Sequence, residues 1–165
     1  MAINAFDLIE RVREHSPVAA NALLDHLVPW LIPMAGGLGV RVREVNNARC
    51  EVTMPLKRRT RNHVGSMYIG AQMTLADLTL GVLLFRLFPP GPYGGLIKRV
   101  EADFVAKAKG GLRCVATLEP ATAAAFEAVR ESPGAKAEGW LPVELIDREG
   151  TVVTRMRVLG ALKRF

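Results

Sequence analysis

The spacing of apolar positions changes along the chain and predicts helices first and strands later. In residues 3–28 apolar residues recur at helical spacing, with an interruption at Pro17, which predicts one or two helices that end at Pro29 and Pro33. From Gly39 onward apolar and polar positions alternate, as is typical of strands. The predicted strands are 39–45, 49–55, 98–110, 112–120, 136–147 and 151–162, with a short helix at 121–131.

One segment, 67–86, departs from this alternation because it is apolar on every side. The turn-rich sequence FPPGPYGG follows it, so we expect a long buried helix that ends there. Asp77 lies near the middle of this helix, with no basic residue between Arg61 and Arg86. An ionised carboxylate without a partner is costly in a protein core, so the presence of Asp77 needs an explanation.

The order of these elements predicts an α+β fold. Six antiparallel strands present one apolar face, and the helix 67–86 is the one helix apolar enough to cover it. A six-stranded antiparallel sheet wrapped around one long apolar helix is the hotdog fold. We therefore expect an N-terminal helical extension at 1–33 and a hotdog domain at 34–165. The expected inward positions of the long strand 98–110 are Val100, Ala102, Phe104, Ala106 and Ala108.

Composition and charge narrow the class of protein. The chain has 165 residues, of which 50% are hydrophobic, so it can fill one globular core. Cys50 and Cys114 fall at inward positions of predicted strands, where we expect buried free thiols in a cytoplasmic protein. The N-terminus lacks the apolar stretch of a signal peptide, and Gln72 and Asp77 make 67–86 a costly membrane span. Much of the net charge of +6 gathers in one basic run, Lys57, Arg58, Arg59 and Arg61.

The loop before the long helix and the helix itself carry a motif. Asn62, Gly65, Gly70 and the triplet Leu75-Ala76-Asp77 resemble, at matching offsets, the phenylacetate-pathway type of acyl-CoA thioesterase in the hotdog superfamily. The sequence RRTRNHVGSMYIGA is most similar to the DUF4442 family of proposed thioesterases. Two positions depart from the motif: the family histidine is Tyr68 here, and the first of two glycines is Ile69, whose side chain crowds its own N–H group.

The resemblance implies a thioester hydrolase whose active site is shared across a homodimer. The first N–H groups of a helix have no intrahelical acceptor, so those of Ile69 and Gly70 can polarise a thioester carbonyl. Asp77 would act as general base or nucleophile, and Asn62 would bind the carbonyl or orient water. At ~1.5 Å per residue, Ile69 and Asp77 are about 12 Å apart along one helix, so one carbonyl needs Asp77 from a second copy.

The remaining candidates are expected to contact substrate. Gly65 and Tyr68 would lie beside it, and the basic run would bind the phosphates of coenzyme A. Each residue also has a plainer interpretation. Asp77 could be a core carboxylate bonded to Thr74 or Thr79, Asn62 an ordinary turn residue, the glycines packing positions, Tyr68 an interface residue, and the basic run a solvated loop.

The first functional hypothesis is an acyl-CoA thioesterase that forms at least a dimer and uses no metal or redox cofactor. The second is an acyl- or acyl-CoA-binding hotdog protein without turnover, which Ile69 favours. A hotdog hydratase needs a histidine with a carboxylate, and only His63 is near the loop. Nucleic-acid binding by the basic run lacks interleaved aromatic residues. We therefore expect an acyl thioester and a second copy as partners, with no nucleic acid and no membrane span.

Overall fold

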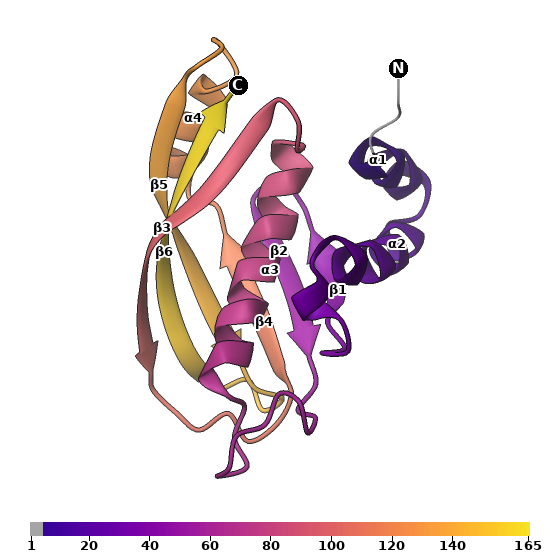
Figure 1. Ribbon diagram of the computed structural model, residues 1–165, viewed down its shortest axis with the longest axis vertical. Helices are drawn as coiled ribbons and strands as arrows, with labels where there is room; N and C mark the ends of the chain where they lie inside the picture. The colour runs from indigo at the N-terminus through magenta and orange to yellow at the C-terminus, as the bar shows by residue number, and fades with distance from the viewer. Residues whose placement is uncertain (1–4) are drawn as a thin grey trace.

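Over residues 5–165, the part of the chain that the computed structural model describes, the strands form one antiparallel sheet (Figure 1). The strands are β1 (Arg41–Val45), β2 (Arg49–Met54), β3 (Tyr93–Phe104), β4 (Leu112–Thr117), β5 (Lys136–Ile146) and β6 (Val152–Arg164). Their order in the six-stranded sheet is β1-β2-β4-β5-β6-β3, so β1 and β3 are the two edges. Each of the six predicted strands has a counterpart in this sheet, although β3 begins at Tyr93, within the predicted turn, and ends before the predicted 98–110 does.

The helix α3 (Ile69–Leu87) crosses one face of the sheet and packs mainly on β2 and β4 (Figure 1). Inward side chains of the strands complete the core, and the free thiols of Cys50 and Cys114 are fully buried among them, as predicted. By length and composition α3 could cross a membrane, but 56% of its most apolar window is buried in this core. The helix held against the curved sheet confirms the hotdog fold.

Two helices precede the sheet, α1 (Ala5–His15) and α2 (Pro17–Leu31), followed by the short 3-10 helix η1 (Pro33–Ala35). In Figure 1 α2 lies beside β1, and α1 packs on α2. Residues 1–4 of the predicted extension lie outside the described residues. The prediction that the helical region ends at Pro29 is wrong, because α2 continues to Leu31. A proline so near the end of a helix removes one backbone hydrogen bond, which α2 tolerates.

Side chains of α2 hydrogen-bond to the backbone of the edge strand β1. The Val42 N–H donates to Asp25 Oδ1 at 2.7 Å, and Asn21 Nδ2 donates to the Arg43 carbonyl at 2.9 Å. Covering an edge in this way prevents it from pairing with another chain. The helix α2 therefore protects one edge of the sheet.

The opposite edge strand, β3, differs from its prediction. Its alternation predicts an apolar face turned to the core, yet Val100 and Phe104 are 39% and 45% exposed. The reason is that α3 packs over β2 and β4 and leaves this side of the sheet uncovered. The strand also ends at Phe104, so Ala106 and Ala108 lie in the loop that follows. Along its length β3 pairs with β6 on one side only.

An aromatic cluster closes one end of the fold, where α4 (Pro120–Ala128) packs on β5. The Phe88 ring lies edge-to-face with Phe126, at 6.2 Å between centroids, and with Tyr93, at 5.4 Å. The Arg130 guanidinium lies 4.5 Å above the centre of the Phe88 ring. Edge-to-face and cation–π contacts on several sides hold Phe88 in one position.

Candidate active site

The N-terminus of α3 carries two of the predicted site residues. The helix begins at Ile69 rather than at Met67, and Tyr68 is its N-cap residue in an extended conformation. No side chain caps this end within the described chain. The N–H groups of Ile69 and Gly70 therefore lack both an intrahelical acceptor and a capping side chain, and they can bind a substrate carbonyl.

This helix start is tied to two other parts of the fold. The Met67 N–H donates to the Ala108 carbonyl at 2.8 Å. Gln72, only 5% exposed, donates from Nε2 to the Met67 carbonyl at 3.0 Å, and its Oε1 accepts from the Thr154 hydroxyl at 2.6 Å. A buried amide bonded at both ends fixes the turn that leads into α3. The sequence signals Gln72 only as a polar residue within an apolar helix.

Asn62 organises the loop before the helix. Its Oδ1 accepts from the N–H groups of Val64, at 3.1 Å, and Ser66, at 2.9 Å. Gly65, in the same turn, has a φ of +76°, a left-handed conformation that favours glycine. Asn62 Oδ1 therefore stabilises the turn. Its Nδ2 has no partner within residues 5–165 and is free to donate to a substrate.

The Tyr68 ring lies against the first turn of α3. A Cβ at Gly70 would come within 2.7 Å of a carbon of this ring, so glycine is required for the ring to lie there. The side chains of Tyr68 and Ile69 are 55% and 47% exposed. The structure therefore brings Tyr68, Ile69 and Gly70 together around the free N–H groups.

Asp77 is exposed, so the expectation of a helix buried on every side is wrong at this position. Neither a hydrogen bond nor an ion pair reaches its carboxylate from any described residue. The hydroxyls of Thr74 and Thr79 donate instead to carbonyls of their own helix, at 2.8 Å and 2.6 Å. Partial burial beside apolar side chains raises the pKa of Asp77, because such surroundings disfavour the charged form.

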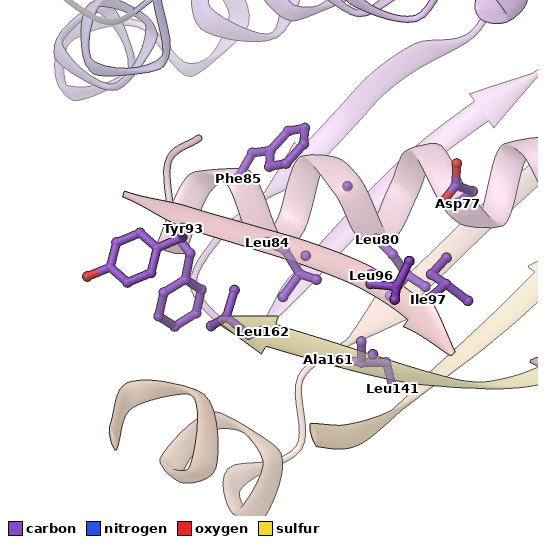
Figure 2. A pocket seen from close by; sticks show the side chains of 14 residues that line it. Asp77, Leu80, Leu84, Phe85, Tyr93, Leu96, Ile97, Leu141, Ala161 and Leu162 are labelled. Atoms are coloured by element: carbon purple, nitrogen blue, oxygen red, sulfur yellow. The ribbon is translucent and has the colours of Figure 1, made fainter. Parts of the chain in front are cut away.

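A cavity of about 160 Å³ opens beside Asp77, between α3 and the strands β3, β5 and β6 (Figure 2). Figure 2 shows Asp77 at one end of the lining and Tyr93 at the other, with Leu80 and Leu84 between them. The rest of the lining is largely apolar. Three glycines, one on α3 and two on strands, leave space that larger side chains would fill: Gly81, Gly95 and Gly160.

The four residues of the basic run are exposed in the loop before α3: Lys57, Arg58, Arg59 and Arg61. Two of them lie over the turn before β1, since a Cβ at Gly37 or Gly39 would come within 2.6 Å of Arg59 Nη1 or Lys57 Nζ. Within the described chain none of the four forms an ion pair. The Tyr68 N–H donates to the Thr60 carbonyl at 2.7 Å, so this basic loop adjoins the start of α3.

The structure thus gathers the N–H donors, Tyr68, Asn62 and the basic loop at one end of α3, and leaves Asp77 beyond their reach. Asp77 lies eight residues further along the helix, about 12 Å at ~1.5 Å per residue. Its side chain leans toward the N-terminus but cannot close this gap. In a single copy the acid and the donors cannot act on the same carbonyl.

Comparison with known proteins places the chain among structures of this fold. A family model, described as a domain of unknown function (DUF4442), matches residues 20–159. The Pseudomonas aeruginosa protein PA5026, named a probable thioesterase of unknown function, is 30% identical, with a TM-score of 0.76 over 87% of this chain and 95% of its own.

More distant structures share the fold. The thioesterase HI1161 of Haemophilus influenzae is 14% identical, with a TM-score of 0.67 over 87% of this chain and 90% of its own. The protein OLEI01261 of Chlorobaculum tepidum is 15% identical, with a TM-score of 0.72 over 88% and 94%. None of the curated proteins compared with the chain matches it. The match over residues 20–159 and the likeness to PA5026 show that this chain belongs to the DUF4442 family, in the hotdog fold.

Proposed function

We propose that this protein is a thioesterase that hydrolyses acyl-CoA, or a related acyl thioester, at a site shared by two copies of the chain. One observation carries the proposal: Asp77, exposed and without a partner among the described residues, lies on the same helix as the N–H groups of Ile69 and Gly70, but about 12 Å from them at ~1.5 Å per residue. Two copies related by a two-fold axis can supply what one copy lacks. The relative PA5026, named a probable thioesterase, supports this class of reaction.

The two edges of the sheet support the dimer. Side chains of α2 cover β1, whereas β3 is 12 residues long and has no partner on its outer side within the described chain. Its inward side chains Ile97 and Val100 are 38% and 39% exposed. A long exposed apolar edge strand is suited to pair with another chain. Antiparallel pairing of two β3 strands would extend the sheet and cover these residues.

In this dimer the chemistry follows from the positions of the groups. The N–H groups of Ile69 and Gly70 hold the thioester oxygen and stabilise the negative charge that develops on it. Asp77 of the second copy takes a proton from water as the water adds to the carbonyl carbon. The tetrahedral intermediate expels the thiolate, which leaves as coenzyme A after protonation. Asn62 Nδ2 is a further donor at the carbonyl, and the basic loop binds the phosphates.

A non-catalytic acyl-CoA-binding protein is the second candidate. The observation that favours it is the Ile69 side chain, 47% exposed beside the donors, where it narrows the approach to them. A hydratase would need a histidine at the site, and His63 is an exposed loop residue without a hydrogen bond among the described residues. Assembly into tetramers and a cytoplasmic location stay predictions.

The deciding experiment measures hydrolysis of acyl-CoAs of several chain lengths by wild type and by Asp77→Asn. We expect turnover by wild type and a loss of about 10²–10⁴-fold in the variant, the usual contribution of a positioned base. Intact turnover in Asp77→Asn would refute the proposed role of Asp77 but not the thioesterase activity itself. Binding of acyl-CoA without turnover by wild type would establish the second candidate instead.

A further inference from the structure

We infer that the cavity beside Asp77 holds the acyl group and selects compact chains of about six carbons. An apolar cavity of about 150 Å³, close to the volume of this one, accepts benzene, a molecule of six carbons. In this assignment the aromatic cluster of Phe88 and Tyr93 sets the depth of the cavity, and Gly81 sets its width. The inference rests on the proposed thioesterase function, because Asp77 marks where the thioester carbon lies.

The direction of the acyl chain follows from the positions along α3. The first cavity-lining residues after Asp77 are three, four and seven positions further on: Leu80, Gly81 and Leu84. Positions with this spacing lie on one face of a helix. A carbonyl carbon within reach of Asp77 therefore places the next carbons of the acyl group at the mouth of the cavity, and the chain runs toward the C-terminus of α3 (Figure 2).

The far end of this path is closed and rigid. Phe88 is 3% exposed and packs edge-to-face on Phe126 and Tyr93. Arg130 stacks on the Phe88 ring and also donates to the Leu87 carbonyl. A ring held on several sides cannot swing aside for a longer chain without losing these contacts. The closed end therefore limits the length of the acyl group.

Gly81 is the cavity glycine on α3, and a side chain there would meet no steric clash. A Cβ at Gly81 meets no atom within 4 Å, whereas a Cβ at Gly160 would come within 3.0 Å of Leu141 Cδ1. The gap on the other side of Gly81, between α2 and α3, is only about 20 Å³. We therefore expect a leucine side chain at position 81 to occupy the cavity itself.

The test compares kcat/KM for saturated acyl-CoAs of two to sixteen carbons in wild type and three variants. For wild type we expect a rise of about fourfold per methylene up to about six carbons and no rise beyond, because each buried methylene contributes about that factor. Gly81→Leu should end the rise about three carbons earlier. The ratio of kcat/KM for the six-carbon substrate to kcat/KM for the two-carbon substrate should then fall at least tenfold, because roughly a fourfold gain is lost for each methylene that no longer fits. Gly81→Ala, the matched control, should change the ratio much less.

Gly81→Leu should keep or raise the melting temperature, since leucine favours a helix more than glycine does. Leu84→Ala removes side-chain volume from the cavity ahead of its closed end, so a longer chain can be accommodated there. The optimum should move to longer chains, which gives a second variant with the opposite effect. A rise that continues to sixteen carbons in wild type would overturn the inference. So would a chain-length profile that neither Gly81→Leu nor Leu84→Ala shifts.

Titration calorimetry with S-alkyl-CoA thioethers, which cannot be hydrolysed, separates this inference from the proposed function. If no acyl-CoA is hydrolysed but thioether affinity shows the same limit and the same shift in Gly81→Leu, the cavity assignment stands and the thioesterase proposal fails. If acyl-CoAs are hydrolysed but kcat/KM does not depend on chain length, the thioesterase proposal stands and the cavity assignment is refuted. Absence of both hydrolysis and binding refutes both.

Discussion

At the scale of single residues, the site depends on backbone groups more than on side-chain identity. Ile69 stands where the related motif has a glycine, and Tyr68 where it has a histidine. The N–H groups at the start of α3 are present whatever these side chains are, and the turn before them is fixed by bonds to Ala108 and Gln72. The exception is Asp77, whose carboxylate is unpaired in the described chain. The donors can therefore be tested by removing an N–H group rather than a side chain.

Ile69→Pro removes one donor with little change to the fold. Proline is favoured at the first position of a helix, and the residue before it has to be extended, as Tyr68 is, with a φ of −62° and a ψ of 141°. We expect kcat to fall about 10²–10³-fold, as for the loss of one oxyanion donor, while the melting temperature changes little. Ile69→Ala keeps the N–H group and should retain activity. Equal activity in the two variants would contradict the role of this N–H group.

The raised pKa of Asp77 links activity and stability to pH. Because apolar surroundings hold the pKa above its unfolded value, the folded protein binds more protons between the two values. The free energy of unfolding therefore falls as pH rises through this window and stays lower above it. Asp77→Asn lacks this penalty. Thermal unfolding should show Asp77→Asn more stable than wild type at pH 7, with the difference shrinking as pH falls toward about 4.

An equal stability difference at every pH would show that Asp77→Asn acts through something other than ionisation. In wild type the same pKa predicts that kcat/KM rises with pH as Asp77 ionises, with a midpoint above that of an ordinary aspartate. Activity that is independent of pH across the acid range would contradict the role of Asp77 as a base.

At the scale of elements, the two edges of the sheet differ, because one is covered by a helix and the other is not. Asn21 and Asp25 of α2 bond to backbone groups of β1, so α2 protects that edge. The edge strand β3 has no such cover and exposes apolar side chains on the face that its sequence turns inward. The long helix α3 leaves Asp77 open on the same uncovered side.

Val100→Lys tests whether this uncovered edge is the dimer interface. Val100 is 39% exposed on the inward face of β3, and a lysine there would place a charge between the two copies. We expect a monomer in light scattering coupled to gel filtration, together with loss of turnover. Asp103→Lys changes an exposed residue on the opposite face of the same strand and should stay dimeric. A dimeric, active Val100→Lys variant would place the interface elsewhere.

At the scale of the whole molecule, the proposed dimer would place the donors and the acid of one copy in two different sites. Each site would use Ile69 and Gly70 of one copy and Asp77 of the other. Such an arrangement would explain an aspartate on an apolar helix, because the second copy and the substrate would complete its surroundings. It also makes a prediction that no site within one chain would make.

Mixed dimers of Asp77→Asn and Ile69→Pro should recover activity that neither variant has alone. In a mixed dimer one site combines the intact donors of the first variant with the intact Asp77 of the second, so about half of the wild-type turnover should return by two-fold symmetry. The measurement is hydrolysis by dimers purified through two different tags. Activity no higher than that of the parent variants would mean that donors and acid are not shared between copies.

The sequence alone determined the elements and the motif. Alternating positions predict the six strands, the unbroken apolar run predicts α3, and the spacing of Asn62, Gly65, Gly70 and Asp77 indicates the family, because all of these are local properties of the chain. Neighbouring residues decide whether a segment forms a helix or a strand. Such features can be read without knowing what packs against them.

Only the tertiary structure decided what each element leaves uncovered. The apolar run alone suggested a buried Asp77 and the alternation a buried Val100, yet both are exposed because α3 covers only part of the sheet. The bond from Thr154 to Gln72 joins residues 82 positions apart and could not be inferred from either residue. Burial and long-range hydrogen bonds depend on where whole elements come to lie, and that position is set by the packing of the entire fold.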